Sequence, residues 1–442
     1  MTLALFGGSP TRSQPFPRHA TYGEEERLAA ERVLTSGILS RFLGSWHPDF
    51  YGGPEVQAFE EEWATAYEAR FAVSVNSATS GLQAAVGACG LEPGDEIIVS
   101  PYSMCASATA PLIYGAVPRF ADIERERFTL CPASVEAAIT SRTKAILVVH
   151  LFGCPADMDA LMDIADRHNL MVIEDCAQAP FARLNGKPVG TLGHLGVFSL
   201  NYHKHVHTGE GGVVVTNDPV LAERLQLIRN HAEAVVEGKG VSDLSNMVGF
   251  NFRLGEIEAA LGRVQLAKAE RLVSERRDNV TRLESMLTGL PGLKPAPCPA
   301  ETEHSYYLHA LLFDAALAGV PREAVVAALR AELPVTELRE GEGPLIRAGY
   351  IKPLYYMPLF QRQIAIGGAG FPFTTIPEAE RPSYAPGTCP ITEDIQDNSM
   401  IIHEWMRPGM TEQDLSDVAD AFHKVFDNLN FLRSRWNEVG KA

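Results

Sequence analysis

The chain has 442 residues, of which 46% are hydrophobic and 21% are charged, and its formal net charge at pH 7 is −17. This length and apolar content exclude a disordered chain, a collagen-like chain and a small disulfide scaffold, and they predict two or three domains with sizeable cores. The acidic balance disfavours a nucleic-acid-binding protein, because such proteins normally carry a basic face. The composition therefore indicates an acidic globular protein of enzyme size.

The sequence shows none of the usual targeting signals. No basic segment precedes an apolar run at the N-terminus, and no uninterrupted apolar stretch of about 18 residues occurs, so we expect neither a secretory signal nor a membrane-spanning helix. The seven cysteines are scattered and form no Cys-x-x-Cys pair, which favours reduced thiols over a disulfide framework or a zinc ribbon. These features predict a cytoplasmic protein.

From about residue 65 to residue 220, short apolar runs alternate with helical stretches. The runs are too apolar for strands exposed on one face, so they predict an α/β fold with a mostly parallel sheet buried between helices. Ligands of such sheets bind beyond the carboxyl ends of the strands. The expected strands are Phe71–Val75, Glu96–Val99, Val117–Phe120, Ala145–Val149 and Met171–Ile173, and the expected helices include Ser80–Cys89 and Ala156–His168.

The character of the sequence changes after Arg253. A long helical region is expected at 254–290, and the proline-rich segment 291–299 is the candidate domain boundary. We therefore expect a large domain over residues 1–290 and a smaller C-terminal α+β domain over residues 291–442. The smaller domain is expected to contain a strand at Tyr306–Leu312, a helix at Arg322–Leu329, a substrate-facing loop at Gly341–Tyr384 and a last helix that opens with a capping box at Thr411–Asp414.

The segment 197–212 contains the most informative lysine of the chain. Lys204 follows an apolar strand and precedes a glycine-rich turn, so it can approach a cofactor at the sheet edge, although most lysines are simply solvated. Three alternating histidines surround it. In an extended segment the side chains of His203, His205 and His207 would share one face, which leaves a metal site open beside ordinary packed or exposed histidines.

Two further segments place polar residues next to predicted strands. Asp175 ends an apolar run, where its carboxylate would face the ligand crevice and hold a ring nitrogen protonated, while Glu174 would point to the opposite side. An ordinary helix N-cap is the alternative for Asp175, and Gln178 lies one helical turn further on. The segment 76–81 lies between a strand and a helix, where backbone N–H groups suit a phosphate, although Ser and Thr are also common caps there.

A phosphate-binding turn, a strand-end aspartate and a lysine, in that order, are what a pyridoxal phosphate enzyme needs. The lysine forms a Schiff base with the cofactor aldehyde, and its released amine then moves a proton between the substrate carbon and the cofactor. The aspartate keeps the pyridine nitrogen charged, so that the ring can accept carbanion charge. The combination predicts pyridoxal 5'-phosphate as the cofactor.

These motifs resemble the DegT/DnrJ/EryC1/StrS group of fold-type I pyridoxal phosphate enzymes, which are mostly sugar and cyclitol aminotransferases. The resemblance runs from about Gly52 to the last helix, and it is closest at Ser199, at Lys204 five residues later, and in the run Gly209–Asp218. It implies a large domain with a mostly parallel, seven-stranded sheet between helices, and a smaller C-terminal α+β domain. It also weakens the metal interpretation of the three histidines, and we assign no metal ligand.

The resemblance implies roles for individual residues. Lys204 would be the catalytic Schiff-base lysine, Asp175 would pair with the pyridine nitrogen, and Gln178 would lie near the ring hydroxyl. Asn251, in the run Gly249–Arg253, would reach the cofactor phosphate of a neighbouring subunit, which implies a homodimer with shared active sites. The implied cofactor-binding residues are Ala78, Thr79, Met104, Asp175, Gln178, Ser199, Lys204 and Asn251.

Three features depart from the family pattern. Ala78 stands where glycine is usual in the phosphate turn. Met104 stands where an aromatic ring is expected to stack on the cofactor, although a thioether can also pack on a π face. The segments Arg41–Gly53 and Gly341–Phe371 are longer than in many relatives and are expected to shape the substrate pocket.

The expected reaction moves an amino group from glutamate or glutamine to a keto-sugar or keto-cyclitol through pyridoxamine 5'-phosphate. Lys204 favours transamination, because a dehydrating branch of the family has histidine at that position. The segments Ile401–Met406 and Met410–Asp414 resemble the inosose branch. Two alternatives stay open: elimination, dehydration or cyclisation with the same cofactor, for which Met104 is the reason, and a binding or regulatory protein without turnover.

Overall fold

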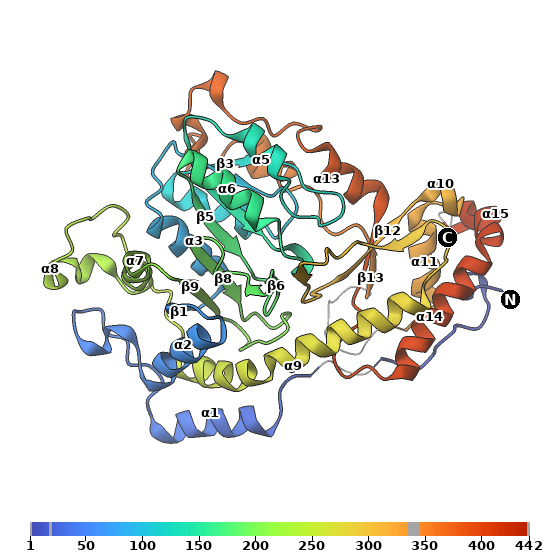
Figure 1. Ribbon diagram of the computed structural model, residues 1–442, viewed down its shortest axis with the longest axis horizontal. Helices are drawn as coiled ribbons and strands as arrows, with labels where there is room; N and C mark the ends of the chain where they lie inside the picture. Colours follow the sequence, from blue (N-terminus) through green and yellow to red (C-terminus); the bar gives the residue numbers. More distant parts are fainter. Residues whose placement is uncertain (1, 17–19, 335–344, 440–442) are drawn as a thin grey trace.

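The computed structural model describes residues 2–16, 20–334 and 345–439. Its centre is a seven-stranded sheet with the strand order β1-β9-β8-β5-β4-β2-β3 (Figure 1). Strand β9 is antiparallel to both of its neighbours, and the other pairs are parallel, so the predicted α/β class with a mostly parallel sheet is confirmed. The strands are β1 Phe71–Val75, β2 Glu96–Val99, β3 Val117–Phe120, β4 Thr143–Val149, β5 Met171–Asp175, β8 Leu195–Ser199 and β9 Gly212–Thr216.

The central sheet is buried on both faces, as its apolar strands predict. Along β4, Leu147 packs into a core on one face, while Ile146 and Val148 pack into a second core on the other face. The helices are α1 Glu24–Ser36, α2 Pro54–Ala66, α3 Ala78–Ala88, α4 Ala106–Thr109, α5 Pro132–Ala138, α6 Met158–His168, α7 Pro219–Arg229, α8 Val236–Lys239, α9 Glu256–Met286, α10 Ala315–Ala318, α11 Arg322–Glu332, α12 Pro358–Arg362, α13 Pro390–Asp394, α14 Glu412–Asp427 and α15 Leu429–Val439.

A second, antiparallel sheet follows the long helix α9, with the order β10-β12-β14-β13. Its two faces serve different cores: Leu311 and Ile401 pack with α11 and α14, whereas Ala310 and Ile402 join the core of the central sheet. The strands are β10 Leu293–Pro295, β12 His309–Phe313, β13 Ile346–Ala348 and β14 Met400–His403, and a small third sheet contains β6 Arg183–Leu184, β7 Lys187–Pro188 and β11 Thr302–Glu303.

Helix α9 runs along the molecule (Figure 1). It contacts α2, which packs beside the central sheet, and α14, which packs beside the second sheet. The first residues of the chain lie at the far end of the molecule, beside α15 (Figure 1), and Leu3 and Phe16 are buried in the core that α11 and α14 share. The N-terminal segment therefore packs against the C-terminal part of the chain, at the core of α11 and α14. The division of the chain at residue 291 stays a prediction.

Two expectations for the C-terminal part need correction. The capping box at Thr411 and Asp414 is present, but it opens α14, and α15 follows it as the last helix. Of the expected loop 341–384, residues 341–344 lie outside the described residues. The remainder is not a plain loop, because it contains β13 and α12 and packs three aromatic rings, of Tyr355, Phe360 and Tyr384, around Phe120 at the edge of the central sheet.

All seven cysteines are free. In the part of the chain that the structure describes, no helix is both long enough and apolar enough to cross a membrane.

Candidate active site

A cavity of about 390 Å³ lies beyond the carboxyl ends of the central strands. Asp175 is the last residue of β5 and Ser199 is the last residue of β8, and both side chains line the cavity. The N-terminus of α3, the turn at 201–211 and two tyrosines from the C-terminal part complete the wall. The lining residues are Ser77, Ala78, Thr79, Leu82, Ser103, Met104, Ala106, Val149, Asp175, Ala177, Gln178, Ser199, Asn201, His203, Lys204, Glu210, Gly211, Tyr307 and Tyr350.

One end of the cavity is the N-terminus of α3. Ser77 is the N-cap, and its Oγ accepts a hydrogen bond from the Ser80 N–H at 3.0 Å. Ala78 and Thr79 occupy the first helical positions, whose N–H groups have no partner within a helix and face an anion favourably. A Cβ on Gly212 would lie 2.8 Å from the Ala78 nitrogen, so only glycine lets β9 come this close to the turn. These residues fit a phosphate.

Asp175 presents a buried carboxylate to the same cavity. Its Oδ2 accepts a hydrogen bond from Ser107 Oγ at 2.8 Å, and its Oδ1 accepts one from the Ala177 N–H at 3.1 Å. Burial raises the pKa of Asp175 above its ordinary value, and the hydrogen bonds and the positive charge of Lys204 oppose this rise. A cationic partner would keep the carboxylate ionised, and the protonated nitrogen of a pyridine ring is such a partner.

Lys204 lies in the turn after β8, where its N–H donates to the Asn201 carbonyl at 2.9 Å. Its Nζ lies 4.4 Å from the centre of the Tyr307 ring. Burial lowers the pKa of Lys204 below its ordinary value, while Tyr350 and Asp175 oppose the change. A lowered pKa leaves more of the amine unprotonated, which is the form that attacks a carbonyl carbon.

Gln178 connects the two halves of the cavity wall. Its Oε1 accepts a hydrogen bond from the Phe152 N–H at 2.8 Å, and its Nε2 donates to the Tyr350 hydroxyl at 3.0 Å. The Tyr350 N–H in turn donates to Gln396 Oε1 at 2.8 Å, and Tyr102 also donates to that oxygen, at 2.7 Å. These hydrogen bonds connect the segment after β13 to the central sheet at the cavity.

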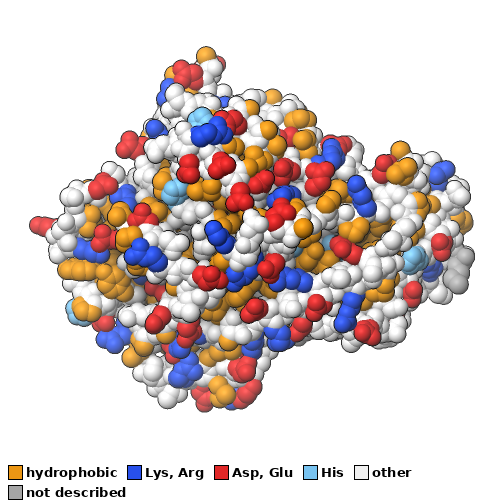
Figure 2. Space-filling model, viewed as in Figure 1, with side chains coloured by type: hydrophobic (Ala, Val, Ile, Leu, Met, Phe, Trp, Pro, Cys, Tyr) orange, Lys and Arg blue, Asp and Glu red, His pale blue; other side chains and the backbone are white. Residues whose placement is uncertain are grey.

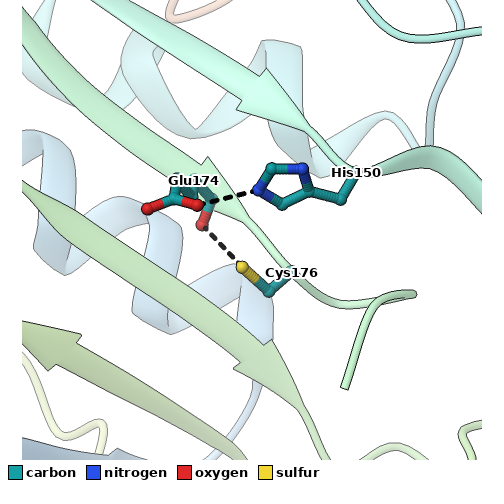
Figure 3. A group of neighbouring side chains, drawn as sticks. All are labelled: His150, Glu174 and Cys176. Atoms are coloured by element: carbon teal, nitrogen blue, oxygen red, sulfur yellow. Dashed lines mark hydrogen bonds and ion pairs between the residues drawn. The ribbon is translucent and has the colours of Figure 1, made fainter. Parts of the chain in front are cut away.

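Glu174 and Asp175 point to opposite sides of β5, as predicted. Figure 3 shows Glu174 beside His150 and Cys176, and Glu174 is absent from the residues that line the cavity with Lys204. The Glu174 carboxylate accepts one hydrogen bond from His150 Nε2 at 2.9 Å and three from backbone N–H groups of residues 190–193. His150 Nδ1 accepts from the Ala156 N–H at 3.0 Å.

These three residues are, among the described residues, the one group whose three possible metal-ligand atoms lie within 4.8 Å of one another. The hydrogen bonds already use the ligand atoms of His150 and Glu174, and burial raises the pKa of the Cys176 thiol well above its ordinary value. The group is therefore best explained as a buried network that braces the strand ends on which Asp175 depends.

The premise for a metal at His203, His205 and His207 is wrong, because this segment forms a turn rather than an extended strand. His205 is buried with its Nε2 2.8 Å from the Ser305 carbonyl oxygen. The His203 ring packs at a tilt against Tyr202 and lines the cavity, whereas the His207 ring packs against Tyr22. The three side chains therefore have different surroundings.

The structure brings together seven of the eight predicted cofactor-binding residues. The exception is Asn251, which is exposed outside the cavity and accepts a hydrogen bond from Arg253 Nε at 2.8 Å. Met104 lines the cavity with 55% of its surface exposed, and its Sδ accepts from the Ala106 N–H at 3.1 Å. The roles implied for these residues, including stacking by Met104, stay predictions.

Sequence reasoning missed three residues of the site. Ser107 holds Asp175 but lies in an apolar stretch without a recognisable motif. Tyr307 fell within an expected strand, whereas β12 begins only at residue 309. Tyr350 lies in the expected loop 341–384 and lines the cavity, while the expectation that this loop faces the substrate stays a prediction. No residue of the segment 41–53 lines the cavity.

The chain is similar to proteins of known family. The model of the DegT/DnrJ/EryC1/StrS aminotransferase family matches residues 46–423. The chain is 34% identical to L-glutamine:2-deoxy-scyllo-inosose aminotransferase of Micromonospora echinospora, over 98% of this chain and 99% of that protein. It is 32% identical to the spore coat polysaccharide biosynthesis protein SpsC of Bacillus subtilis, over 91% and 95%.

A solved structure agrees with these sequence comparisons. The crystal structure of DesI in the presence of its TDP-sugar product superimposes with a TM-score of 0.79 at 28% identity, and the match covers 98% of this chain and 99% of that one. A family model that matches most of the chain, relatives aligned over nearly their full length and a shared fold lead to one conclusion. This chain is a member of the DegT/DnrJ/EryC1/StrS aminotransferase family.

Proposed function

We propose that the protein is a pyridoxal 5'-phosphate-dependent aminotransferase that moves the amino group of glutamine or glutamate to the ketone of a cyclitol. The observation that carries the proposal is the meeting of Lys204, Asp175 and the N-terminus of α3 in one cavity. A nucleophilic amine, a buried carboxylate and an anion-binding helix end are the three groups that this cofactor requires.

When bound, pyridoxal 5'-phosphate supplies an aldehyde carbon that takes up the amino group and a ring that accepts electron density. The N–H groups of Ala78 and Thr79 and the Ser199 hydroxyl would hold its phosphate. Asp175 would hold a proton on the pyridine nitrogen, because its carboxylate is buried and otherwise faces only neutral donors and Lys204.

Lys204 Nζ performs the proton transfer in this proposal. It would take the proton from the α-carbon of the donor and deliver it to the carbon that the cofactor aldehyde supplies, and in the second half of the reaction it would move a proton from that carbon to the former ketone carbon of the acceptor. Tyr307 lies against Nζ and limits its path, and Gln178 donates a hydrogen bond to the hydroxyl of Tyr350, which also lines the cavity.

The lining of the cavity supports an uncharged acceptor with several hydroxyl groups. Asn201, Tyr307 and Tyr350 offer neutral hydrogen-bonding groups, and Lys204 is the one cation among the described residues that line the cavity. A nucleotide diphosphate calls for arginine or lysine beside its phosphates. Similarity to an enzyme named for 2-deoxy-scyllo-inosose supports the same choice.

The proposal includes a homodimer with shared active sites in the cytoplasm. Asn251 is exposed outside the cavity of its own chain, as a residue that serves a neighbouring subunit must be. The seven free cysteines support a reducing compartment. Mixing inactive Lys204→Ala and Asn251→Ala proteins after dissociation should restore activity, because some mixed dimers then contain one complete site. No recovery over the separate proteins would contradict the shared site.

A donor–acceptor screen tests the proposed reaction. Glutamine and glutamate are each combined with 2-deoxy-scyllo-inosose and with a nucleotide-linked keto-sugar, and the aminated product is measured by mass spectrometry. We expect product with the inosose and at least about tenfold less with the nucleotide-linked sugar, since loss of a charged-group contact costs this much. Preference for the nucleotide-linked sugar would overturn the acceptor, and loss of ammonia or water without amine transfer would overturn the reaction class.

A further inference from the structure

The start of helix α1 reaches the turn that carries Lys204. Tyr22 lies two residues before α1, and its hydroxyl donates a hydrogen bond to the carbonyl oxygen of His207 at 2.6 Å. The two rings also pack together, with their centres 4.7 Å apart. His207 is the third residue after Lys204. Tyr22 therefore holds the lysine turn, which we define as residues 201–211.

A second contact binds the same residue of the lysine turn. The His207 N–H donates to Gln265 Oε1 at 3.4 Å, and Gln265 is a fully buried residue of α9. Gln265 Nε2 in turn donates to the Thr21 carbonyl oxygen at 3.1 Å and to Glu26 Oε1 at 2.7 Å. Both backbone groups of His207 are thus bonded to side chains, and one of these side chains also fixes the residue next to Tyr22.

The position of Tyr22 is itself fixed by the packing of α1 on α9. Figure 1 shows α1 alongside the first part of α9, and the buried residues of α1 pack with Ala260 of that helix. At the start of α1, the Gly23 N–H donates to Glu26 Oε2 at 2.8 Å, and Lys268 Nζ of α9 lies 2.7 Å from Glu26 Oε1. A helix start that is capped and paired in this way cannot shift without breaking several bonds. Tyr22 is therefore a rigid point of attachment.

The outward face of α1 is a solvated surface. It carries ion pairs between exposed side chains, such as Arg27 with Glu24 at 2.6 Å and with Glu31 at 2.9 Å. Figure 2 shows acidic and basic side chains mixed along the lower edge of the molecule, where α1 lies. Exposed pairs of this kind contribute little to stability. The connection of α1 to the site is therefore made by its N-terminal end.

Lys204 depends on its turn for the position of its amine. Its Nζ contacts the face of the Tyr307 ring, and a ring face attracts a cation without fixing it at one point. The Lys204 N–H donates to the Asn201 carbonyl, but this bond lies within the turn and does not fix the turn against the rest of the protein. The bond from Tyr22 to His207 does. Such fixing matters, because a displacement of about 1 Å can lower a reaction rate about a hundredfold.

Tyr22 is suited to donate this bond without taking part in substrate binding. Burial and then the carboxylates of Glu26 and Glu258 raise the pKa of Tyr22 above its ordinary value, so its hydroxyl keeps the proton that it donates to His207. Tyr22 is not among the residues that line the cavity. An effect of Tyr22 on the reaction must therefore pass through the lysine turn.

We propose that Tyr22 is a positioning residue for the reaction: by holding the His207 carbonyl it fixes the lysine turn, and it thereby sets where Lys204 Nζ lies in the cavity. The inference rests on the proposed function, because that function makes Lys204 the proton carrier. None of the family motifs includes Tyr22, which precedes them in the chain. The N-terminal segment then serves catalysis although none of its described residues lines the cavity.

The test compares Tyr22→Phe with Tyr114→Phe in the holoenzyme. Tyr22→Phe keeps the ring contact with His207 and removes only the hydroxyl. We expect kcat to fall about three- to tenfold, as for the loss of one net hydrogen bond, while the KM values for donor and acceptor each change less than about twofold. Tyr22→Ala, which also removes the ring, should lower kcat further. A rise in either KM with an unchanged kcat would make Tyr22 a substrate-binding residue and overturn the proposal.

Tyr114→Phe is the matched control. The Tyr114 hydroxyl is buried without a hydrogen-bond partner among the described residues, and Tyr114 is not among the residues that line the cavity. Its removal should leave kcat and both KM values unchanged. A decrease in kcat equal to that of Tyr22→Phe would show that the loss of any tyrosine hydroxyl has this effect, and it would overturn the specific role of Tyr22.

A second readout does not depend on turnover. Hydrogen–deuterium exchange of the holoenzyme is followed by mass spectrometry in peptides that cover the lysine turn. We expect exchange there to be at least about threefold faster in Tyr22→Phe than in the unchanged protein, with no change in peptides from β4. Equal exchange in both proteins, or faster exchange throughout the chain, would overturn the positioning role. A donor–acceptor screen without product, together with faster exchange confined to the lysine turn, would instead overturn the proposed reaction and keep Tyr22 as the residue that orders the turn.

Discussion

The two walls of the cavity differ in how their residues come together. The wall from the central sheet contains Asp175 and Ser199, each at the end of a strand, and Lys204 five residues beyond Ser199. The opposite wall contains Tyr307, which directly precedes β12, and Tyr350, which directly follows β13. The first wall follows from local chain order, whereas the second depends on how the two sheets pack.

In the proposed function, this difference separates the residues of the reaction from the residues of substrate selectivity. The parallel central sheet places its strand ends at one edge, so any chain with this strand order delivers the reactive groups to the same place. The second wall is assembled from long-range contacts such as Gln178 with Tyr350 and Tyr102 with Gln396. Changes in the first wall should therefore abolish the reaction, and changes in the second should alter rate and substrate preference by smaller factors.

The largest effect is expected for Lys204→Ala. Activity should fall at least about a thousandfold, because both the nucleophile and the proton carrier are lost. The visible absorption that the covalently bound cofactor gives to the protein should disappear as well. Lys187→Ala, an exposed lysine in β7, is the matched control and should leave both readouts unchanged. Activity within tenfold of the unchanged protein would remove Lys204 from its central role.

Asp175→Asn should come next, with a decrease in kcat of about a hundredfold, in the range that follows the loss of one strong electrostatic partner. The substitution keeps the size of the side chain and the hydrogen bond with Ser107, but it removes the charge. Ser107→Ala should cost less, because it removes one hydrogen bond and leaves the carboxylate. Measured kcat values in the opposite order would show that the charge of Asp175 is not the decisive property.

Tyr350→Phe tests the second wall. The ring contacts with Tyr102 and Phe152 remain, and only the hydroxyl that accepts from Gln178 is lost. We expect a decrease in kcat/KM of about three- to tenfold, as for the loss of one net hydrogen bond. An effect as large as that of Asp175→Asn would place Tyr350 among the reactive groups and break the distinction between the walls.

The smallest effect is expected for the pH dependence of folding stability, through His403 in the second sheet. His403 is buried, its Nδ1 accepts from the Trp405 N–H at 3.2 Å, and its Nε2 lies 2.8 Å from His309 Nδ1. Burial and then His309 lower the pKa of His403 well below its ordinary value of 6.5. The unfolded chain therefore binds a proton below pH 6.5 that the folded protein resists, so stability is full above pH 6.5 and declines as the pH falls below it.

His403→Gln should weaken this decline. Urea unfolding between pH 7.5 and pH 5 should show a slope smaller by about 1.4 kcal/mol per pH unit below pH 6.5, because one titrating group is gone. Glutamine keeps a side-chain group that hydrogen-bonds near His309. His423→Gln is the control on α14, since its Nε2 lies by a backbone carbonyl and no shielded histidine pair is disturbed. An unchanged slope in His403→Gln would assign the acid sensitivity to other groups.

The central sheet could be predicted because each of its strands is indicated by a short stretch of neighbouring residues. The strands β1, β2 and β3 begin and end at the predicted residues, since short, doubly buried apolar runs flanked by turn residues have few other interpretations. Glu174 and Asp175 were predicted on opposite sides of one strand from the alternation of side chains alone. The same alternation does not apply to the three histidines, because the segment that contains them forms a turn and is not extended.

The order of the proposed reactive groups could be predicted from the sequence: the phosphate turn within residues 76–81, the strand end at Asp175 and the lysine at position 204. Each depends on neighbours a few residues away, so a linear pattern is enough to predict it. Only the packing of the two sheets brings Tyr307 and Tyr350 to the same cavity as these groups and brings Arg347 and Arg407 to Glu404. Those contacts join residues far apart in the chain, and their formation depends on packing between two sheets, which no local pattern encodes.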